Sequence, residues 1–270
     1  TQDLSYYCDC SNAQYNSFQS QITIRALAGW TLQGSYTYQL QKAIGFGYDG
    51  NYYFEYGPKY GHTGNSGMGY DGGMPDHEWI FTQNWNIPFG HGMKWGSKAP
   101  KAVDLVAGGW VLSGTTVYYS GLRFSPSLEN YGPNTQPNVG PNNRPNKGSG
   151  SLYPSNQNRN QWFIGCPGGQ CTSGPYLWPD SNTYGNYPIN TLIGPRYINQ
   201  DLTLMKSFHI TERWSLGLRM DSRNVFNHTN LGGPNTDVQS PQVGQITGIA
   251  FGGSNGTGMR QLQYALTLSF

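Results

Sequence analysis

The chain has 270 residues, of which only 11% are charged, against about 25% in an ordinary soluble domain. Its formal net charge is +2 and its lysines and arginines are scattered, which excludes the basic footprint of a nucleic-acid-binding protein. It also lacks the run of roughly 18 apolar residues that a transmembrane helix needs, whereas transmembrane β-strands, apolar at only every second position, are compatible with this composition.

The first two predicted strands cover residues 15–26 and 30–41, where apolar and polar residues alternate with a period of two. Phe18, Ile22 and Ile24 share one side of the first segment. Only three residues separate the segments, which predicts a hairpin with a tight turn. The opposite side carries mainly Gln, Ser and Thr, and such an uncharged polar side suits the wet interior of a barrel better than the surface of a soluble sandwich.

Loops and strands alternate through the middle of the chain. Residues 43–76 have no sustained period and too much glycine for a strand, so we expect a long loop there. Strands are predicted over residues 77–87 and 109–120, and we expect the connection after Ile87 to be short. Residues 121–195 are rich in proline, which cannot donate to a sheet ladder, so they predict a second long loop.

The last part of the chain holds three more predicted strands. Residues 197–208 and 214–226 are expected to form a hairpin, and the loop 227–259 that follows contains a candidate short strand at 244–250. The final strand, 260–270, alternates more regularly than any other segment. Its apolar side runs up to a terminal aromatic and consists of Leu262, Tyr264, Leu266, Leu268 and Phe270.

These elements predict an all-β fold, an antiparallel meander of seven or eight transmembrane-type strands that forms a small barrel or a partial barrel wall. We treat residues 1–270 as a single domain of this type. Short connections at one end of the strands and long ones at the other are the pattern of outer-membrane proteins with extracellular loops. The predicted location is therefore the bacterial outer membrane or the extracellular surface, with Trp30 and Trp214 near strand ends as candidate lipid-interface aromatics.

The four cysteines, Cys8, Cys10, Cys166 and Cys171, all fall on the predicted extracellular side of the strands. An even number of cysteines in such loops favours disulfides in an oxidising compartment. Their spacing does not supply the repeated pairs of a zinc site. All four are thus disulfide candidates, and three pairings are compatible with the sequence.

No catalytic, cofactor or metal site is predicted. Residues 67–72 match GxGxxG, but no strand–helix–strand unit surrounds them. The histidines form no ligand-spaced cluster, and no GxSxG motif accompanies a strand-to-helix pattern. We therefore expect no enzyme and no cofactor. The tyrosine-rich loops either pack within a loop cap or stack on sugars of a partner.

Two segments carry a family resemblance. RWSLGLRMDSRNVFNHTNLGGPNT at 213–236 and RQLQYALTLSF at 260–270 resemble the end of TonB-dependent outer-membrane receptors, above all the Oar-like group, and residues 15–39 and the Pro88–Gly90 turn resemble its barrel strands. The resemblance implies the C-terminal segment of a receptor barrel, whose last strand is the signal read by the barrel-insertion machinery. Receptors of this class use about 22 strands around a plugged lumen, so seven or eight strands alone are not expected to transport.

The strand edges leave two assemblies open. An isolated sheet of seven strands presents unpaired backbone groups, which are costly in lipid, so further wall strands must complete it or an eighth strand must close it into a narrow barrel. The alternative is pairing between copies, which would give a homo-oligomer, either a multimeric tube or an extracellular filament. The expected partners are therefore outer-membrane lipid or other copies of the chain.

Overall fold

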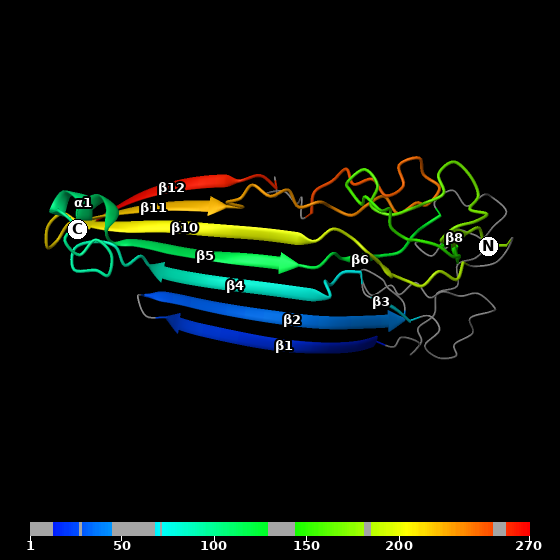
Figure 1. Ribbon diagram of the computed structural model, residues 1–270, viewed down its shortest axis with the longest axis horizontal. Helices are drawn as coiled ribbons and strands as arrows, with labels where there is room; N and C mark the ends of the chain where they lie inside the picture. Colours follow the sequence, from blue (N-terminus) through cyan, green and yellow to red (C-terminus); the bar gives the residue numbers. More distant parts are fainter. Residues whose placement is uncertain are drawn as a thin grey trace.

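The computed structural model describes residues 13–26, 29–44, 68–70, 72–128, 144–180, 185–250 and 258–270. Its long strands are β1 (Ala13–Ala26), β2 (Trp30–Ile44), β4 (His77–Asn86), β5 (Trp110–Tyr119), β10 (Tyr197–His209), β11 (Ser215–Arg223) and β12 (Gln261–Ser269). They form one antiparallel sheet in the order β1-β2-β4-β5-β10-β11-β12 (Figure 1). The predicted all-β meander is confirmed.

The remaining elements are short. β3 (Met68–Tyr70) pairs with the end of β2, inside the segment predicted as the loop 43–76, most of which lies outside the described residues. β6 (Arg123–Phe124) pairs with β9 (Leu192–Ile193), and β7 (Asn146–Lys147) pairs with β8 (Tyr176–Leu177). The helix α1 covers Lys101–Ala107. No helix in the described part of the chain is long and apolar enough to cross a membrane.

Two predictions about the last third of the chain were wrong in detail. The strand predicted to reach residue 226 ends at Arg223, because Asn224 adopts a positive φ of 47° and its side chain bonds the backbone of His228. Residues 244–250, the candidate extra strand, form only an isolated bridge between Leu231 and Ile249. After Arg223 the Asn224 side chain bonds to nearby backbone groups, as asparagine often does in turns, and the chain leaves the ladder of the sheet.

The connection after Ile87 was predicted to be short, and this was wrong. Residues 87–109 form an ordered connector that contains α1, and we call them the connector. Phe89 bridges to Trp95, and Gly90, Gly92 and Gly96 turn the chain with positive φ values of 133°, 75° and 72°. These glycines permit a compact series of turns in a segment whose sequence shows no periodic alternation of apolar residues.

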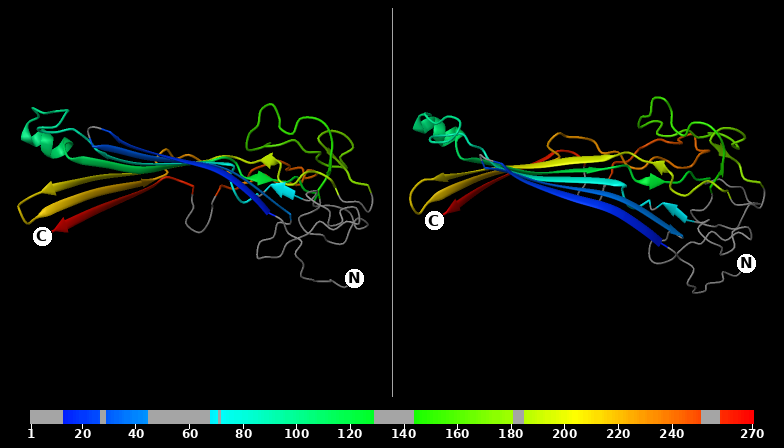
Figure 2. Two further views of the ribbon diagram at one scale, coloured as in Figure 1. Left: turned by 90° about the horizontal axis from the view of Figure 1, so that it is seen from below. Right: turned by 60° about the horizontal axis from the view of Figure 1, so that its bottom comes forward.

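The sheet is a single open layer with different structures at its two ends. The described parts of the β5–β10 and β11–β12 connections gather at one end, and the connector, the β10–β11 turn and the C-terminus lie at the other (Figure 1). In the other views the layer twists, as β-sheets do (Figure 2). Among the described strands, β1 and β12 each pair on one side only, so the sheet does not close on itself.

The register gives the two faces of the sheet opposite chemistry. The first face, the apolar face, carries a row that crosses it strand by strand: Trp30, Trp85, Leu112, Leu204, Met220 and Tyr264. The neighbouring row on the other face, the polar face, is Thr31, Asn84, Ser113, Thr203, Asp221 and Gln263. Side chains alternate between the two faces along each strand. Because the strands pair in register, the apolar rows form one continuous surface and the polar rows form the other.

The hydrophobic core lies outside this sheet. We call residues 120–128, 144–180, 185–196 and 224–250 the cap. Its core consists of Leu128, Phe163, Cys171, Tyr176, Tyr187, Leu192, Val238 and Val243. None of the buried hydrophobic residues that the structure describes belongs to a long strand. A single layer has no second layer to bury its apolar face, so that face needs an apolar surrounding.

Candidate functional site

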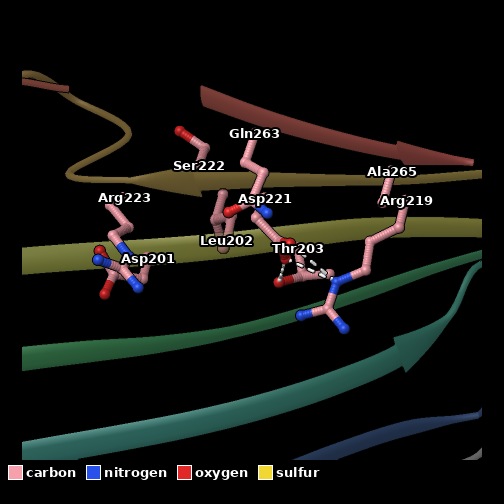
Figure 3. Close-up of a pocket in the computed structure, with 9 residues that line it drawn as sticks. All are labelled: Asp201, Leu202, Thr203, Arg219, Asp221, Ser222, Arg223, Gln263 and Ala265. Carbon is pink, nitrogen blue, oxygen red and sulfur yellow. Dashed lines mark hydrogen bonds and ion pairs between the residues drawn. The ribbon is translucent and has the colours of Figure 1, made fainter. Parts of the chain in front are cut away.

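The polar face holds an open pocket of about 460 Å³ where β10, β11 and β12 run side by side (Figure 3). We call it the polar pocket. Its side chains come from sequence positions some 60 residues apart, and it is lined by Asp201, Leu202, Thr203, Arg219, Asp221, Ser222, Arg223, Gln263 and Ala265. Neither histidine nor cysteine is among them. Its surface is therefore suited to water and polar groups.

Hydrogen bonds fix both carboxylates of this pocket. Asp221 accepts a hydrogen bond of 2.6 Å from the Thr203 hydroxyl, and Arg219 Nε donates to both of its carboxylate oxygens at 2.9 and 2.8 Å. Asp201 accepts from the Asn199 amide and from the backbone N–H of Asn224, each at 2.9 Å. The Arg219 side chain is 54% exposed, so its ion pair contributes only about 0–1 kcal/mol. These hydrogen bonds hold both carboxylates on the polar face.

A partly buried ion pair joins the sheet to the cap. Arg123 donates from Nε and from a terminal nitrogen to the two oxygens of Asp76, at 2.8 and 2.5 Å, and its guanidinium lies 4.0 Å from the centre of the Tyr70 ring. Both charged side chains are less than a fifth exposed. The Asn190 amide also donates to the carbonyl of Tyr70 at 2.7 Å. This bidentate geometry fixes the cap against the end of β4.

The cap interior combines aromatic packing with a buried cation. The Phe163 ring lies 5.4 Å from that of Phe124 and 6.3 Å from that of Tyr176, and the Tyr176 and Tyr187 rings are 5.2 Å apart. Arg144 is 6% exposed and donates to the carbonyl of Tyr187. Burial lowers the pKa of Arg144 to about 10, so it is still protonated at neutral pH, and burial raises the pKa of Tyr176. The cap is thus folded around its own core.

The cap also contains a disulfide. Cys166 and Cys171 are bonded, with their Cα atoms 5.5 Å apart, and Cys171 belongs to the cap core. Cys8 and Cys10, the other two candidates, lie outside the described residues. The bond closes a short loop beside Val238, whose carbonyl accepts from the backbone N–H of Cys166 at 2.7 Å.

Removing this disulfide is expected to loosen the cap. For a loop this short, the loss of the constraint on the unfolded chain is worth about 2 kcal/mol. The double variant Cys166→Ser/Cys171→Ala should therefore be cleaved faster by protease between residues 161 and 180. The variant Thr172→Ala, at an exposed neighbour, serves as the control and should be cleaved like the wild type. Equal cleavage of all three proteins would contradict the prediction.

The structure places the predicted barrel-end residues on one strand. Leu262, Tyr264, Leu266 and Leu268 lie along the apolar face of β12 and are each more than half exposed, and Phe270 follows the strand with 89% of its surface exposed. The Trp214 ring lies 5.2 Å from that of Phe270. Trp30 pairs with Trp85 across the β2–β4 register. Aromatic residues therefore gather at the end of the sheet opposite the cap.

Sequence reasoning did not identify the polar pocket, although part of its signal was present. Asp201, Thr203 and Asp221 all occupy the polar parity of their predicted strands. Asp201 and Asp221 stand out because this parity otherwise carries mainly uncharged residues, and such charged positions are the signal for a polar site. Bringing Gln263 beside them requires the β11–β12 register, which the sequence does not state.

Comparison with known proteins gives one finding. Residues 1–263 match the family described as an outer membrane beta barrel domain. Neither a curated protein nor a solved structure shows a significant match to the chain.

Proposed function

Because the chain belongs to the outer membrane beta barrel domain family, we propose that its sheet forms part of the wall of a TonB-dependent type of receptor that imports a nutrient. The family itself makes the protein a β-barrel protein of the bacterial outer membrane. The receptor identity rests on the resemblance of residues 213–236 and 260–270. In this proposal the wall is not an enzyme and does not transport alone.

The continuous apolar and polar rows across seven strands are the observation that carries this proposal. The apolar face exposes Phe18, Ile22, Leu266 and other large side chains, as a surface in contact with lipid chains does. The polar face, with its polar pocket, fits a wet or protein-filled lumen. Because an open layer of this kind leaves β1 and β12 unpaired on one side within the described residues, a receptor wall would continue on both edges.

The cap supports an outward-facing role. It is held by the Arg123–Asp76 ion pair, has its own core and contains a disulfide. A unit with a disulfide suits the extracellular side, where oxidising conditions preserve such bonds. The opposite end of the sheet, with β12 and Phe270, would then lie in the periplasm, where the insertion machinery meets the last strand.

A cross-linking experiment on the two edge strands tests the receptor proposal. A photoreactive phenylalanine analogue would replace Gln21 on β1 or Thr267 on β12, both exposed on the polar face, in the parent protein in its native membrane. We expect cross-links to strands of the same polypeptide outside residues 1–270. The analogue at Thr82 in the interior strand β4 is the control and should give no cross-link to a barrel strand outside these residues, because β4 is already paired on both sides.

A second candidate function is self-assembly into an extracellular tube or fibre. The observation that favours it is the length of the two open edges, 14 residues in β1 and 9 in β12. Head-to-tail pairing of unlike edges gives a ring if it closes and a filament if it does not. A cross-link from Gln21 to β12 of another copy would support this assembly and overturn the receptor proposal. A link between Gln21 and β12 of one copy would indicate a closed small barrel.

A further inference from the structure

The connector (residues 87–109) lies at the end of the sheet opposite the cap and is fixed to the apolar face. The Trp95 ring meets the Trp85 ring edge to face at 6.1 Å, and Trp110 Nε1 donates to the carbonyl of Val106 at 2.9 Å. Lys206 Nζ donates to the carbonyl of Gly108 at 2.5 Å. Trp85, Trp110 and Lys206 all project from the apolar face. The connector therefore lies at the rim of the apolar face, at the end of the sheet where α1 is labelled in Figure 1.

Hydrogen bonds hold the connector in one shape. The backbone N–H of Gly90 donates to the carbonyl of Trp95, and the backbone N–H of Trp95 donates to the carbonyl of Pro88, each at 2.9 Å. The Asp104 carboxylate accepts from the backbone N–H of His91 at 2.7 Å. The connector is therefore a defined surface at the rim. All of these hydrogen bonds are made within the connector itself.

Several large apolar side chains of the connector are exposed. None of the residues of α1 is buried. Within the connector, the large apolar side chains that are 45–68% exposed are Met93, Trp95, Val103, Leu105 and Val106. A helix of seven residues is too short to be stable in water by itself, and apolar residues on such a helix are typical of segments that lie in a membrane interface.

Positive charge is interleaved with these apolar side chains. Lys94, Lys98 and Lys101 are all exposed. Asp104 is the only acidic residue of the connector, and its carboxylate already accepts the His91 N–H, so the connector has a net charge of +2. Lys206 is already engaged, because its ammonium lies 4.9 Å from the Phe208 ring centre and donates to Gly108. The three connector lysines are thus available to an anionic surface.

We propose that the connector binds the anionic headgroups of phospholipids in the periplasmic leaflet of the outer membrane. Leu105, Val106 and Met93 would enter the boundary of the acyl chains, and Lys94, Lys98 and Lys101 would pair with phosphates. Lipid fits better than a protein partner, because the connector continues the lipid-facing surface through Trp85 and Trp110. This inference rests on the outer-membrane family and on the orientation proposed above, in which the cap faces outward, and not on the receptor identity.

Native mass spectrometry of the full chain in nonionic detergent tests the proposal. The protein would be equilibrated with equal amounts of phosphatidylglycerol and phosphatidylethanolamine, and the lipids retained would be counted. We expect the wild type to retain the anionic lipid several-fold over the zwitterionic one, because each lysine near an anionic surface adds attraction. In the variant Lys94→Gln/Lys98→Gln/Lys101→Gln the ratio should fall to about one as that attraction is removed.

A matched variant removes the same charge at the other end of the molecule. Lys147→Gln/Arg196→Gln/Arg260→Gln changes three exposed cations near the cap and should keep the wild-type ratio. The variant Leu105→Ser/Val106→Ser should reduce retention of both lipids and leave their ratio unchanged. An unaltered ratio in the connector lysine variant, or an equal loss in the cap variant, would overturn the proposal.

The wild-type protein supplies a test that requires no substitution. Salt screens exposed charges, so the preference for the anionic lipid should fall as the ionic strength rises. A preference that is insensitive to salt would also overturn the proposal.

Discussion

Truncating Phe163 to alanine is expected to unfold the cap and leave the sheet intact. Phe163 is fully buried and packs against Phe124 and Tyr176, so its removal should cost about 3–5 kcal/mol. The long strands contribute no residue to the cap core in the described structure, so the destabilisation should remain local. Hydrogen exchange followed by mass spectrometry should show fast exchange in residues 144–180 and unchanged protection in β4 and β5.

Phe226→Ala is the matched control for this experiment. It removes the same side chain from a position that is 74% exposed, where little packing is lost. Its exchange pattern should resemble that of the wild type. Simultaneous loss of protection in the cap and in β4–β5 would contradict the separation of the two units. Full protection of the cap in Phe163→Ala would contradict the role of its core.

Introducing arginine at Phe81 is expected to destabilise the inserted sheet. Phe81 lies in the middle of β4 on the apolar face and stacks on Trp79 at 6.1 Å, and a Cβ atom at Gly34 would meet its ring at 3.0 Å. A charged side chain at the middle of a bilayer costs about 2–4 kcal/mol on the lipid face of a barrel. Urea unfolding of the protein from phospholipid vesicles measures this loss.

Two further variants separate charge from packing. Phe81→Leu keeps an apolar side chain, so it reports the cost of the altered shape alone. Thr82→Arg places the same charge one residue later, on the polar face, where Thr82 is exposed, and should be tolerated. If Thr82→Arg were as damaging as Phe81→Arg, the assignment of the two faces to lipid and lumen would be wrong.

The long strands were accessible to sequence reasoning because each carries its own signal. Residues 15–26 and 30–41 alternate with a period of two, and the structure has strands at 13–26 and 30–44. The ends were less accurate, because they depend on local hydrogen bonds such as those of Asn224. Alternation tells which residues share a face, and so the apolar side of β12 could be predicted residue by residue.

The connector and the cap could not be predicted in the same way. Gly90, Gly92 and Gly96 produce turns without any period, and α1 is too short to show a helical repeat. The cap core brings Leu128, Phe163 and Val238 together from distant parts of the chain. Its glycine- and proline-rich segments resemble ordinary loops in sequence, because the contacts that order them are long-range.

The polar pocket shows the same limit on a smaller scale. The sequence places Asp201 and Asp221 on the polar parity of two strands. Only the register sets Thr203 on one side of Asp221 and Gln263 on the other. Local alternation is a property of each strand and can be read from its residues. The register, the cap core and the connector arise from contacts between segments far apart in the chain, whose energies no local pattern records.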